Sequence, residues 1–551
     1  MAIVAVTAAC ALPAAASAAD LRPCGSARCG SVTVPLVAAE PAAGTVRVGF
    51  EVYAHRRGAK PRDTVLVSAG SDGVPTTAGR AALLALLEPL RERRDIVLVD
   101  ARGTGTSGRV GARRDAYGAG AAAGDLEAVR HDLGAGHVEL YAAGDGARIA
   151  LAYAVRYGDR LRALVLDGGP SAALFGGDGR AEAHGLGKAL GAGEPVVARL
   201  AARLRTRPLR VHGRIDDDAV ARAAVRADAR SLAELPAAAT AALEGDAVPL
   251  ARLVARTAAP PGRQAAQARA SNCLDDAPPA ASAAVNGGPF TAPTWLRALG
   301  LAACKGWPQP ATPDPVVPPG AALSGAPALV LAGESGVGAP TATLRKAAGL
   351  LPSGIYVRVR GAAALPALSD PSGCAGVLAR AFLATRGKPS PACASRPARP
   401  RGVTAFPLNL ASASAASRDA KTHGRDRSTL ADRRAATAAA LGVADALADA
   451  ETATAPASVK GLRGGSAAVL RRATGVTLTL RGLRFVRDAA LDGLVTYDGK
   501  TGSVYAALSL HAADGSTRAF VLTWNTKQAK GYAAARGSAD GRPLLLVLRA
   551  P

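Results

Sequence analysis

The sequence predicts an α/β protein in which a helical insertion interrupts a mostly parallel sheet and a small β-rich unit follows. Short apolar runs alternate with helical patterns from residue 45 to residue 167, which is typical of parallel strands joined by right-handed crossovers. This alternation stops near Pro170 and resumes at Ala328. After residue 400 the pattern changes to short strands separated by turn residues, which predicts a separate β-rich unit.

The first part of the sheet is predicted from the period and length of the apolar runs. Asp95–Asp100 reads DIVLVD, a continuous apolar run of the kind that a strand buried on both faces shows. The other expected strands and helices follow the same alternation. We expect strands at 31–37, 45–55, 64–69, 95–100, 137–142 and 161–167, and helices at 77–93, 125–133 and 147–157.

The rest of the chain completes the sheet and then adds the β-rich unit. Asp-Gly pairs at Asp498, Asp514 and Asp540 indicate hairpin turns. We expect strands at 328–332 and 355–359 and helices at 341–351 and 374–383 in the sheet, then a helix at 430–450 and strands at 476–480, 483–486, 494–497, 503–510, 518–524 and 544–548.

Composition limits the classes of protein to which the chain can belong. At 551 residues, with 49% hydrophobic residues, the chain can bury two large units. The formal net charge of +24 is expected either for an anionic partner, such as a wall polymer or a lipid headgroup, or for a composition in which Ala, Gly, Arg and Pro are all abundant. No basic run is interleaved with aromatic residues, so nucleic-acid binding has no specific support.

The N-terminus resembles an export signal. The first 19 residues are apolar and end in small residues, and Ala16-Ser17-Ala18 fits a cleavage site. No Lys or Arg precedes the apolar stretch. Cys10 after Thr7-Ala8-Ala9 leaves a lipoprotein site as an alternative. No later segment has 18 uninterrupted apolar residues, so we expect a secreted or cell-envelope protein without a membrane span.

Six cysteines remain once the leader is removed, and an even number in an exported chain indicates disulfides. They fall into three local groups, although 15 pairings are possible. No C-x-x-C motif or nearby His accompanies them, so no metal site is expected. The predicted disulfides are Cys24–Cys29, Cys273–Cys304 and Cys374–Cys393.

Two segments resemble a known family. Asp95–Ser107 reads DIVLVDARGTGTS, and His137–Gly168 reads HVELYAAGDGARIALAYAVRYGDRLRALVLDG. Together they resemble the secreted tripeptidyl-aminopeptidase-like members of the proline-iminopeptidase family of serine peptidases. The resemblance runs from Cys24 to Cys393. It implies an α/β-hydrolase fold with a cap inserted after the sixth strand, a Ser-Asp-His triad and no cofactor.

The same resemblance places other residues at the three triad positions. The family's nucleophilic Ser lies six residues before the ALAYA helix block, where this chain has Gly144. The family's acid lies in a loop after the seventh strand, where this chain has Gly336. The family's His follows the eighth strand, where this chain has Ala364. We therefore expect no catalytic residue at these positions.

The oxyanion region also differs from the family. The loop after the third strand reads Gly70-Ser71-Asp72-Gly73 instead of G-G-P-G, and the second backbone donor is the N–H of Asp145. The two carboxylates are therefore expected near the place where negative charge would develop. Asp145 is interpreted as a helix cap, with a carboxylate nucleophile as an alternative. A third alternative is that Asp72 and Asp145 bind an amine or another cation.

Asp167 ends the sixth strand, where some α/β-hydrolases carry their acid. Without a His it cannot complete a triad, and in the sequence D-G-G-P it is better explained as a turn residue. Trp295 and Trp307 are expected in the core of the cap.

These observations predict the organisation of the chain and its function. We expect a hydrolase scaffold that has lost hydrolysis and binds a small molecule or peptide. The alternative is an active serine peptidase or esterase of this family that uses displaced residues. Attachment of the Arg-rich tail to an anionic wall or membrane is compatible with either. The expected segments are a signal peptide at 1–19, the core at 20–170 and 324–395, the cap at 171–323, a linker at 396–429 and a helix with a β-rich unit at 430–551.

Overall fold

The computed structural model describes residues 20–548 except for short internal segments. The expected signal peptide, with Cys10, lies outside the described residues, and so do Ser71 and Asp72. The segments left out are 59–60, 62, 71–72, 171, 176–178, 212, 259–263, 277–287, 371, 397–401, 419–424, 452–456 and 528–532.

The core is built on a nine-stranded sheet, sheet A, with the order β1-β2-β3-β5-β4-β6-β7-β10-β11. The strands from β5 to β11 in this order are parallel, and β1 to β3 add an antiparallel edge. The strands are β1 (Arg22–Cys24), β2 (Ala27–Pro35), β3 (Thr45–Tyr53), β4 (Asp63–Gly70), β5 (Arg94–Val99), β6 (Val138–Gly144), β7 (Leu161–Asp167), β10 (Ala328–Gly333) and β11 (Gly354–Val359).

Helices cover both faces of sheet A because its central strands are apolar on both sides. Along β4, Leu66 packs into the core on one face, whereas Val65 and Val67 pack into the core on the other. The first core includes α2 (Ala119–Asp132), α3 (Gly146–Arg156) and α11 (Thr341–Leu350), and the second includes α1 (Arg80–Leu87) and α13 (Cys374–Thr385), with α12 (Pro366–Ser369) against it.

The predicted helix at 77–93 is wrong in its extent. Only α1 is α-helical there, and 3₁₀ turns flank it on both sides. Pro89 lies in the second of these turns, and proline removes a backbone donor and disfavours a continuing α-helix.

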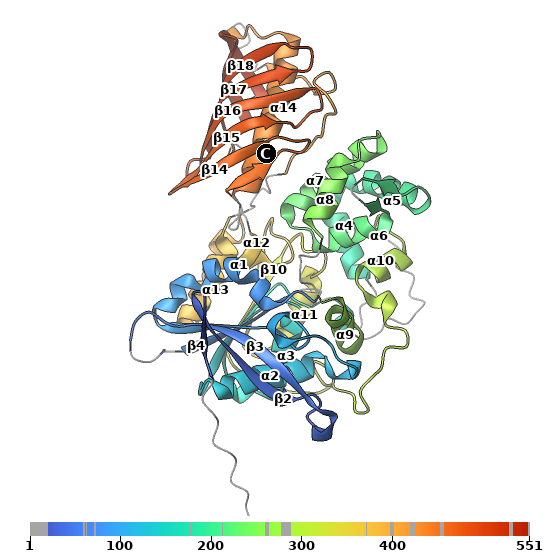
Figure 1. Ribbon diagram of the computed structural model, residues 1–551, viewed down its shortest axis with the longest axis vertical. Coiled ribbons are helices and arrows are strands. Elements are labelled where there is room, and N and C mark those ends of the chain that lie inside the picture. The colour runs from blue at the N-terminus through green and yellow to red at the C-terminus, as the bar shows by residue number, and fades with distance from the viewer. Residues whose placement is uncertain are drawn as a thin grey trace, which may run out of the picture.

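In the described part of the cap there are seven α-helices, and the cap lies between β7 and β10 and beside the core (Figure 1). Trp295 is fully buried there and packs edge-on against Phe290. The prediction for Trp307 is wrong, because it packs beside Tyr117 of the core and under the guanidinium of Arg114. The cap elements are α4 (Arg180–Leu190), α5 (Glu194–Thr206), β8 (Leu209–Arg210), β9 (Arg214–Ile215), α6 (Asp217–Arg226), α7 (Ala229–Leu243), α8 (Val248–Arg256), α9 (Ala265–Asp275) and α10 (Ala292–Ala298).

The three disulfides pair as the sequence predicts: Cys24–Cys29, Cys273–Cys304 and Cys374–Cys393. The second fixes the end of α9 to the loop before β10. Among the described residues, no helix is both long enough and apolar enough to cross a membrane.

The C-terminal unit is a second nine-stranded sheet, sheet C, packed on α14 (Leu430–Ala450). Every neighbouring pair in it is antiparallel. The strands, in their order across the sheet, are β12 (Ser417–Arg418), β20 (Arg542–Leu548), β19 (Ala533–Ala539), β18 (Thr517–Asn525), β17 (Ser503–Ala512), β16 (Ala489–Asp498), β15 (Gly475–Leu483), β14 (Ser466–Arg472) and β13 (Ser458–Lys460).

Local signals explain most of this unit. Thr429 and Asp432 form a capping box at the start of α14. Asp540 and Gly541 both have positive φ, as a two-residue hairpin turn requires. The predicted strand at 483–486 is wrong, because β15 ends at Leu483 after a bulge in its pairing with β16.

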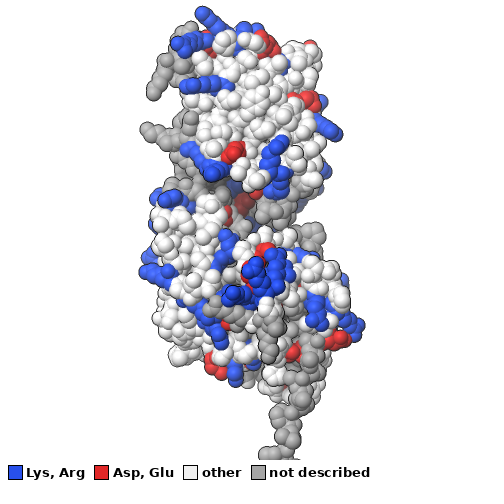
Figure 2. Space-filling view, turned by 90° about the vertical axis from the view of Figure 1, so that its left-hand side faces the viewer, with Lys and Arg blue, Asp and Glu red and all other residues white. Residues whose placement is uncertain are grey.

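The C-terminal unit lies at one end of the molecule, beside the cap (Figure 1). One continuous hydrophobic core includes cap helices, α14 and sheet C. Figure 2 shows one face of the molecule. Lys and Arg side chains are spread over the whole length of this face, and few acidic side chains lie among them.

Candidate functional site

The candidate site lies at the turn from β6 to α3, at the edge of sheet A where the parallel strands end. Gly144 closes β6 with a φ of 60°, and α3 begins at Gly146. A Cβ on Gly146 would lie only 1.9 Å from the Ser68 carbonyl oxygen, so the turn needs glycine there. This is the geometry of a nucleophile elbow, but Gly144 has no side chain that could attack a substrate.

The backbone donor next to Gly144 is already occupied. The Asp145 N–H donates to the Gly70 carbonyl at 2.7 Å, and Gly70 and Gly144 are register partners at the ends of β4 and β6. In an active elbow, the equivalent N–H stabilises the oxyanion. In this arrangement it extends the pairing of the two strands.

Gly73, which follows β4, contacts the cap. Gly73 has a φ of 77°, and its carbonyl accepts a hydrogen bond from the Gln264 N–H at 2.8 Å. A Cβ on Gly73 would lie 2.2 Å from the Gln264 carbonyl oxygen. The start of α9 therefore contacts Gly73 directly.

The other two predicted triad positions adjoin each other. Gly336 follows β10, Ala364 follows β11, and these two strands are parallel neighbours of each other in sheet A. A Cβ on Gly336 would lie 3.2 Å from the Ala364 Cα atom. The two positions therefore lie in contact, but neither residue has a group that transfers protons.

Asp145 does not cap α3, so that interpretation is wrong. Its side chain makes no cap hydrogen bond. One carboxylate oxygen lies 3.8 Å from the guanidinium of Arg148, one turn along the helix, and about a third of the side chain is exposed. The Asp145 carboxylate faces a small cavity instead.

Asp167 has a structural role. It is fully buried, accepts a hydrogen bond from the Tyr141 hydroxyl at 2.7 Å and accepts another from the Ala367 N–H at 2.7 Å. Burial raises the pKa of Asp167 to about 6, and the bonds from Ala367 and Tyr141 oppose the rise. It joins the ends of β6 and β7 to the start of α12.

A cavity of about 40 Å³ lies against the elbow, between sheet A, α3 and α9. Gly70, Gly73 and Asp145 line it, as the sequence predicts for the pocket, and Asp167 does not. The polar side chains that face it from α9 are Gln267, Ser271 and Asp275.

These three side chains were missed by the sequence analysis. Burial raises the pKa of Asp275 to about 7, against the opposing effects of Arg148 and the Ala119 N–H. Ser271 donates to an Asp275 carboxylate oxygen at 3.1 Å. The buried Gln267 Oε1 accepts no hydrogen bond. No motif spacing marks these residues. The one local signal is their polarity beside Cys273 in an Ala-rich segment.

Arg148 joins the elbow helix to the cap. Its guanidinium donates to the Ser271 hydroxyl at 3.1 Å, the Asn272 side chain at 3.2 Å and the Asp276 carboxylate at 3.0 Å. The Arg148 side chain is almost fully buried. Water therefore competes little for its ion pair with Asp276.

No histidine is among the residues that line the elbow cavity. His184 on α4 is exposed, and the next residue in the chain is Gly185. A Cβ on Gly185 would lie 3.8 Å from the Gly336 carbonyl oxygen. Within the described part of the chain, no three His, Cys, Asp or Glu side chains gather in a way that would hold a metal ion.

The chain is similar to known proteins in sequence and in fold. The sequence profile of the alpha/beta hydrolase fold family matches residues 79–371. An esterase from Thermogutta terrifontis has 20% identity and a TM-score of 0.35, over 64% of this chain and 98% of that one. Proline iminopeptidase from Mycobacterium smegmatis has 16% identity and a TM-score of 0.34, over 64% and 98%. No curated protein matches the sequence.

Proposed function

Because this chain belongs to the alpha/beta hydrolase fold family, we propose that it is a hydrolase scaffold that binds a ligand without cleaving it. The observation that carries the proposal is the elbow, where Gly144 keeps the turn and has no hydroxyl. Acyl transfer needs a nucleophile, a base that activates it and free oxyanion donors.

Two further observations support the proposal. The Asp145 N–H is bonded to Gly70, so a developing oxyanion would have to compete with a backbone carbonyl for it. Gly336 and Ala364, which adjoin each other, provide neither carboxylate nor imidazole. We infer that the ancestor was a tripeptidyl-aminopeptidase-like hydrolase, on the evidence of the segments Asp95–Ser107 and His137–Gly168.

The chemistry of the cavity favours a ligand that donates hydrogen bonds. Asp145, Asp275 and the unpaired Gln267 Oε1 are all acceptors there. The end of the ligand that enters is therefore a small donor such as a primary amine. Primary alkylamines should raise the melting temperature of the protein more than the matching alcohols, and Gln267→Leu should remove this difference.

Turnover assays test the central proposal. Purified protein should hydrolyse p-nitrophenyl esters and aminoacyl or tripeptidyl p-nitroanilides no faster than buffer with an equal amount of denatured protein. A free oxyanion hole can leave about 10³–10⁴-fold catalysis over water after loss of the triad, and we expect none here because the Asp145 N–H is bonded to Gly70. A kcat in the ordinary enzyme range, about 1 s⁻¹ or more, would contradict it.

An active hydrolase with displaced residues is the second candidate, and Ser271 beside Asp275 is the observation that favours it. In that case Ser271→Ala would abolish the turnover. The Ser271 hydroxyl also accepts from Arg148, which fits a structural role better.

We also propose that the protein is exported to the cell surface or beyond. Three disulfides support this, since such bonds persist in oxidising compartments. N-terminal sequencing of protein from the culture medium should begin near residue 20. Retention of residues 1–19 in a cytosolic fraction would contradict export.

A further inference from the structure

The outer face of sheet C, on the side away from α14, is a broad surface on which several large hydrophobic side chains of the described residues are exposed. Residues that point towards α14, such as Leu478, Val495 and Leu522, are buried. Side chains alternate across a strand, so their neighbours point outwards. Four of the seven exposed large hydrophobic residues in the described part of the chain lie on this face: Leu470, Leu494, Tyr505 and Val521.

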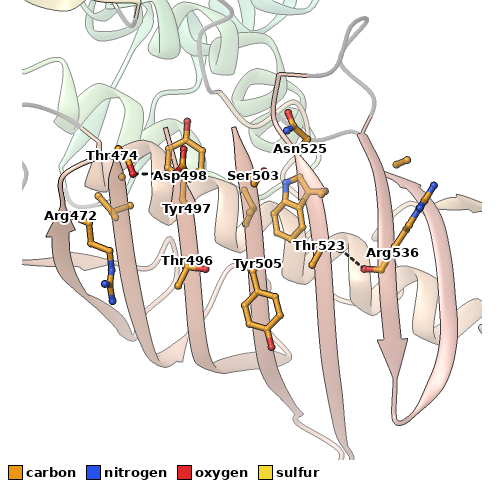
Figure 3. A pocket seen from close by; sticks show the side chains of 15 residues that line it. Arg472, Thr474, Thr496, Tyr497, Asp498, Ser503, Tyr505, Thr523, Asn525 and Arg536 are labelled. Carbon is orange, nitrogen blue, oxygen red and sulfur yellow. Dashed lines mark hydrogen bonds between the residues drawn. The ribbon is translucent and has the colours of Figure 1, made fainter. Parts of the chain in front are cut away.

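One row of side chains crosses this face from strand to strand. Successive register partners place Leu470, Thr477, Thr496, Tyr505, Thr523 and Arg536 side by side on β14 to β19. In Figure 3, Tyr505 lies between Thr496 and Thr523, and Arg472 and Arg536 stand at the two sides. The row therefore contains three threonine hydroxyl groups and one tyrosine ring. A guanidinium group lies near each end of the row.

The face is hollowed over these six strands, with a volume of about 800 Å³. Neighbouring strands are about 4.8 Å apart, so Arg472 on β14 and Arg536 on β19 are about 24 Å apart, five strand spacings. A small anion cannot contact both guanidinium groups. The hollow is wide and open, and it fits a chain that crosses the strands.

The charges on the face match an anionic ligand. Arg472 donates to the Thr477 hydroxyl at 2.7 Å, and neither Arg472 nor Arg536 forms an ion pair with a described carboxylate. The acidic residue of the hollow, Asp498, already accepts hydrogen bonds from the Thr501 N–H at 2.7 Å and the Thr474 hydroxyl at 3.1 Å. Those bonds lower the pKa of Asp498 and keep it ionised, so the two guanidinium groups face a single carboxylate in the hollow.

We propose that this face binds an extended anionic glycan. A sugar ring presents C–H groups on its flat side, which pack on an exposed tyrosine ring, and hydroxyl groups at its edge, which pair with Thr, Ser and Asn side chains. Guanidinium groups bind carboxylate and phosphate groups along the chain. Tyr505 lies within the hollow, and Leu470, Leu494 and Val521 lie on strands and not on a projecting loop, which favours a polymer over a lipid bilayer.

Binding of the full-length protein to defined polymers tests the proposal. The probes are polygalacturonate and phosphomannan, which distinguish carboxylate from phosphate groups, neutral dextran, and vesicles of phosphatidylglycerol with phosphatidylcholine. We expect affinity for one or both anionic glycans, weakened by salt, and none for dextran. Binding to vesicles alone, or to no glycan, would overturn the proposal.

Variants locate the binding face. Arg472→Ala combined with Arg536→Ala should weaken glycan binding about a hundredfold or more, since loss of each bond to a charged group weakens it about tenfold or more. Tyr505→Ala should weaken it about fivefold, by loss of the ring contact. The matched controls are Arg205→Ala on α5 and Val377→Ala on α13, both exposed and far from this face in the sequence.

The controls must bind like the wild type, and circular dichroism must show each variant folded. Equal binding by the Tyr505 variant, the double arginine variant and the controls would overturn the assignment of this face. Size-exclusion chromatography with light scattering examines a second copy of the chain as the occupant. A dimer that the face variants dissociate, without glycan binding, would also overturn it.

Discussion

At the scale of single residues, the elbow keeps the backbone of a hydrolase and lacks its chemistry. Gly144 has the positive φ of the turn, and Gly146 lets α3 approach the Ser68 carbonyl. Each of these features is needed for the backbone to pass from β6 into α3. The side chains that would perform hydrolysis are not needed for that passage, so their loss leaves the fold intact.

Restoring the triad tests this interpretation. Gly144→Ser with Gly336→Asp and Ala364→His should hydrolyse p-nitrophenyl acetate measurably faster than the wild type. The single Gly144→Ser variant is the control and should stay close to the wild type, because it has no base to activate it. A folded triple variant without any gain would show that the region has diverged beyond these three side chains.

Asp275 should make the free energy of unfolding depend on pH. Its pKa in the folded protein is about 7, above the ordinary value for an aspartate, about 3.9. The folded state therefore binds the proton more tightly, and its stabilising effect is complete below pH 4 and is lost as pH rises to 7. Between pH 5 and pH 7 the loss should be about 2 kcal/mol.

Denaturant unfolding of the wild type and Asp275→Asn at several pH values measures this effect. The difference between the two proteins isolates Asp275 from other titrating groups. The variant should lose less stability than the wild type between pH 5 and pH 7, and Asp20→Asn, at an exposed residue, should follow the wild type. Parallel curves for Asp275→Asn and the wild type would show that this carboxyl is ionised throughout the range.

At the scale of elements, buried ion pairs join the cap to α14. Asp445 on α14 accepts two hydrogen bonds from Arg252 of α8, at 2.6 and 2.8 Å, and one from Arg230 of α7 at 2.9 Å. Glu234 of α7 pairs with Arg230 and Arg256. These arginines lower the pKa of the buried Glu234 carboxylate against the opposing effect of burial, so its contribution to stability is lost only in acid.

Asp445→Ala should therefore be costly. The substitution leaves two arginines without their shared carboxylate at a mostly buried interface, and breaking such a pair costs about 3–5 kcal/mol. Differential scanning calorimetry should show a lower melting temperature. Asp449→Ala is the matched control on the same helix, and its effect should be smaller because its side chain is 28% exposed. Equal effects would contradict the role of the buried network.

The sequence predicts elements well where one local signal dominates. The run Asp95–Asp100 and the capping residues before α14 are recognisable without tertiary context. The sequence does not predict strands β14 and β19 because small and polar residues dominate both and their pairing is set by neighbouring strands. The pocket residues of α9 were missed for a related reason: α9 meets the elbow only through the tertiary packing of the cap on the core.

At the scale of the whole molecule, the units that the sequence separates are not independent. Cap helices, α14 and sheet C share one hydrophobic core, whereas sheet A has two cores of its own. Residues of α9 and Arg148 then join the cap to the elbow. Sheet C, on which we propose that a polymer binds, therefore shares its hydrophobic core with the cap.

Removal of residues 402–551 should damage the cap more than the core. The truncation removes α14 and sheet C from the hydrophobic core that they share with cap residues such as Leu232 and Leu235, and burial of a leucine contributes about 1.5–3 kcal/mol. Hydrogen exchange should show faster exchange in α7 and α8 than in β5 and β6. Unchanged exchange in α7 and α8 would mean that the cap is stable without the C-terminal unit.

Intact-mass spectrometry after treatment with a fluorophosphonate tests whether the wild-type protein lacks an activated serine. Such reagents form a covalent adduct with an activated serine, and the account predicts no adduct on the native protein. The triple variant with Ser, Asp and His restored serves as the positive control. A stoichiometric adduct on the wild-type protein, mapped to Ser271 or any other serine of the elbow cavity, would contradict the proposal that this hydrolase scaffold binds a ligand without cleaving it.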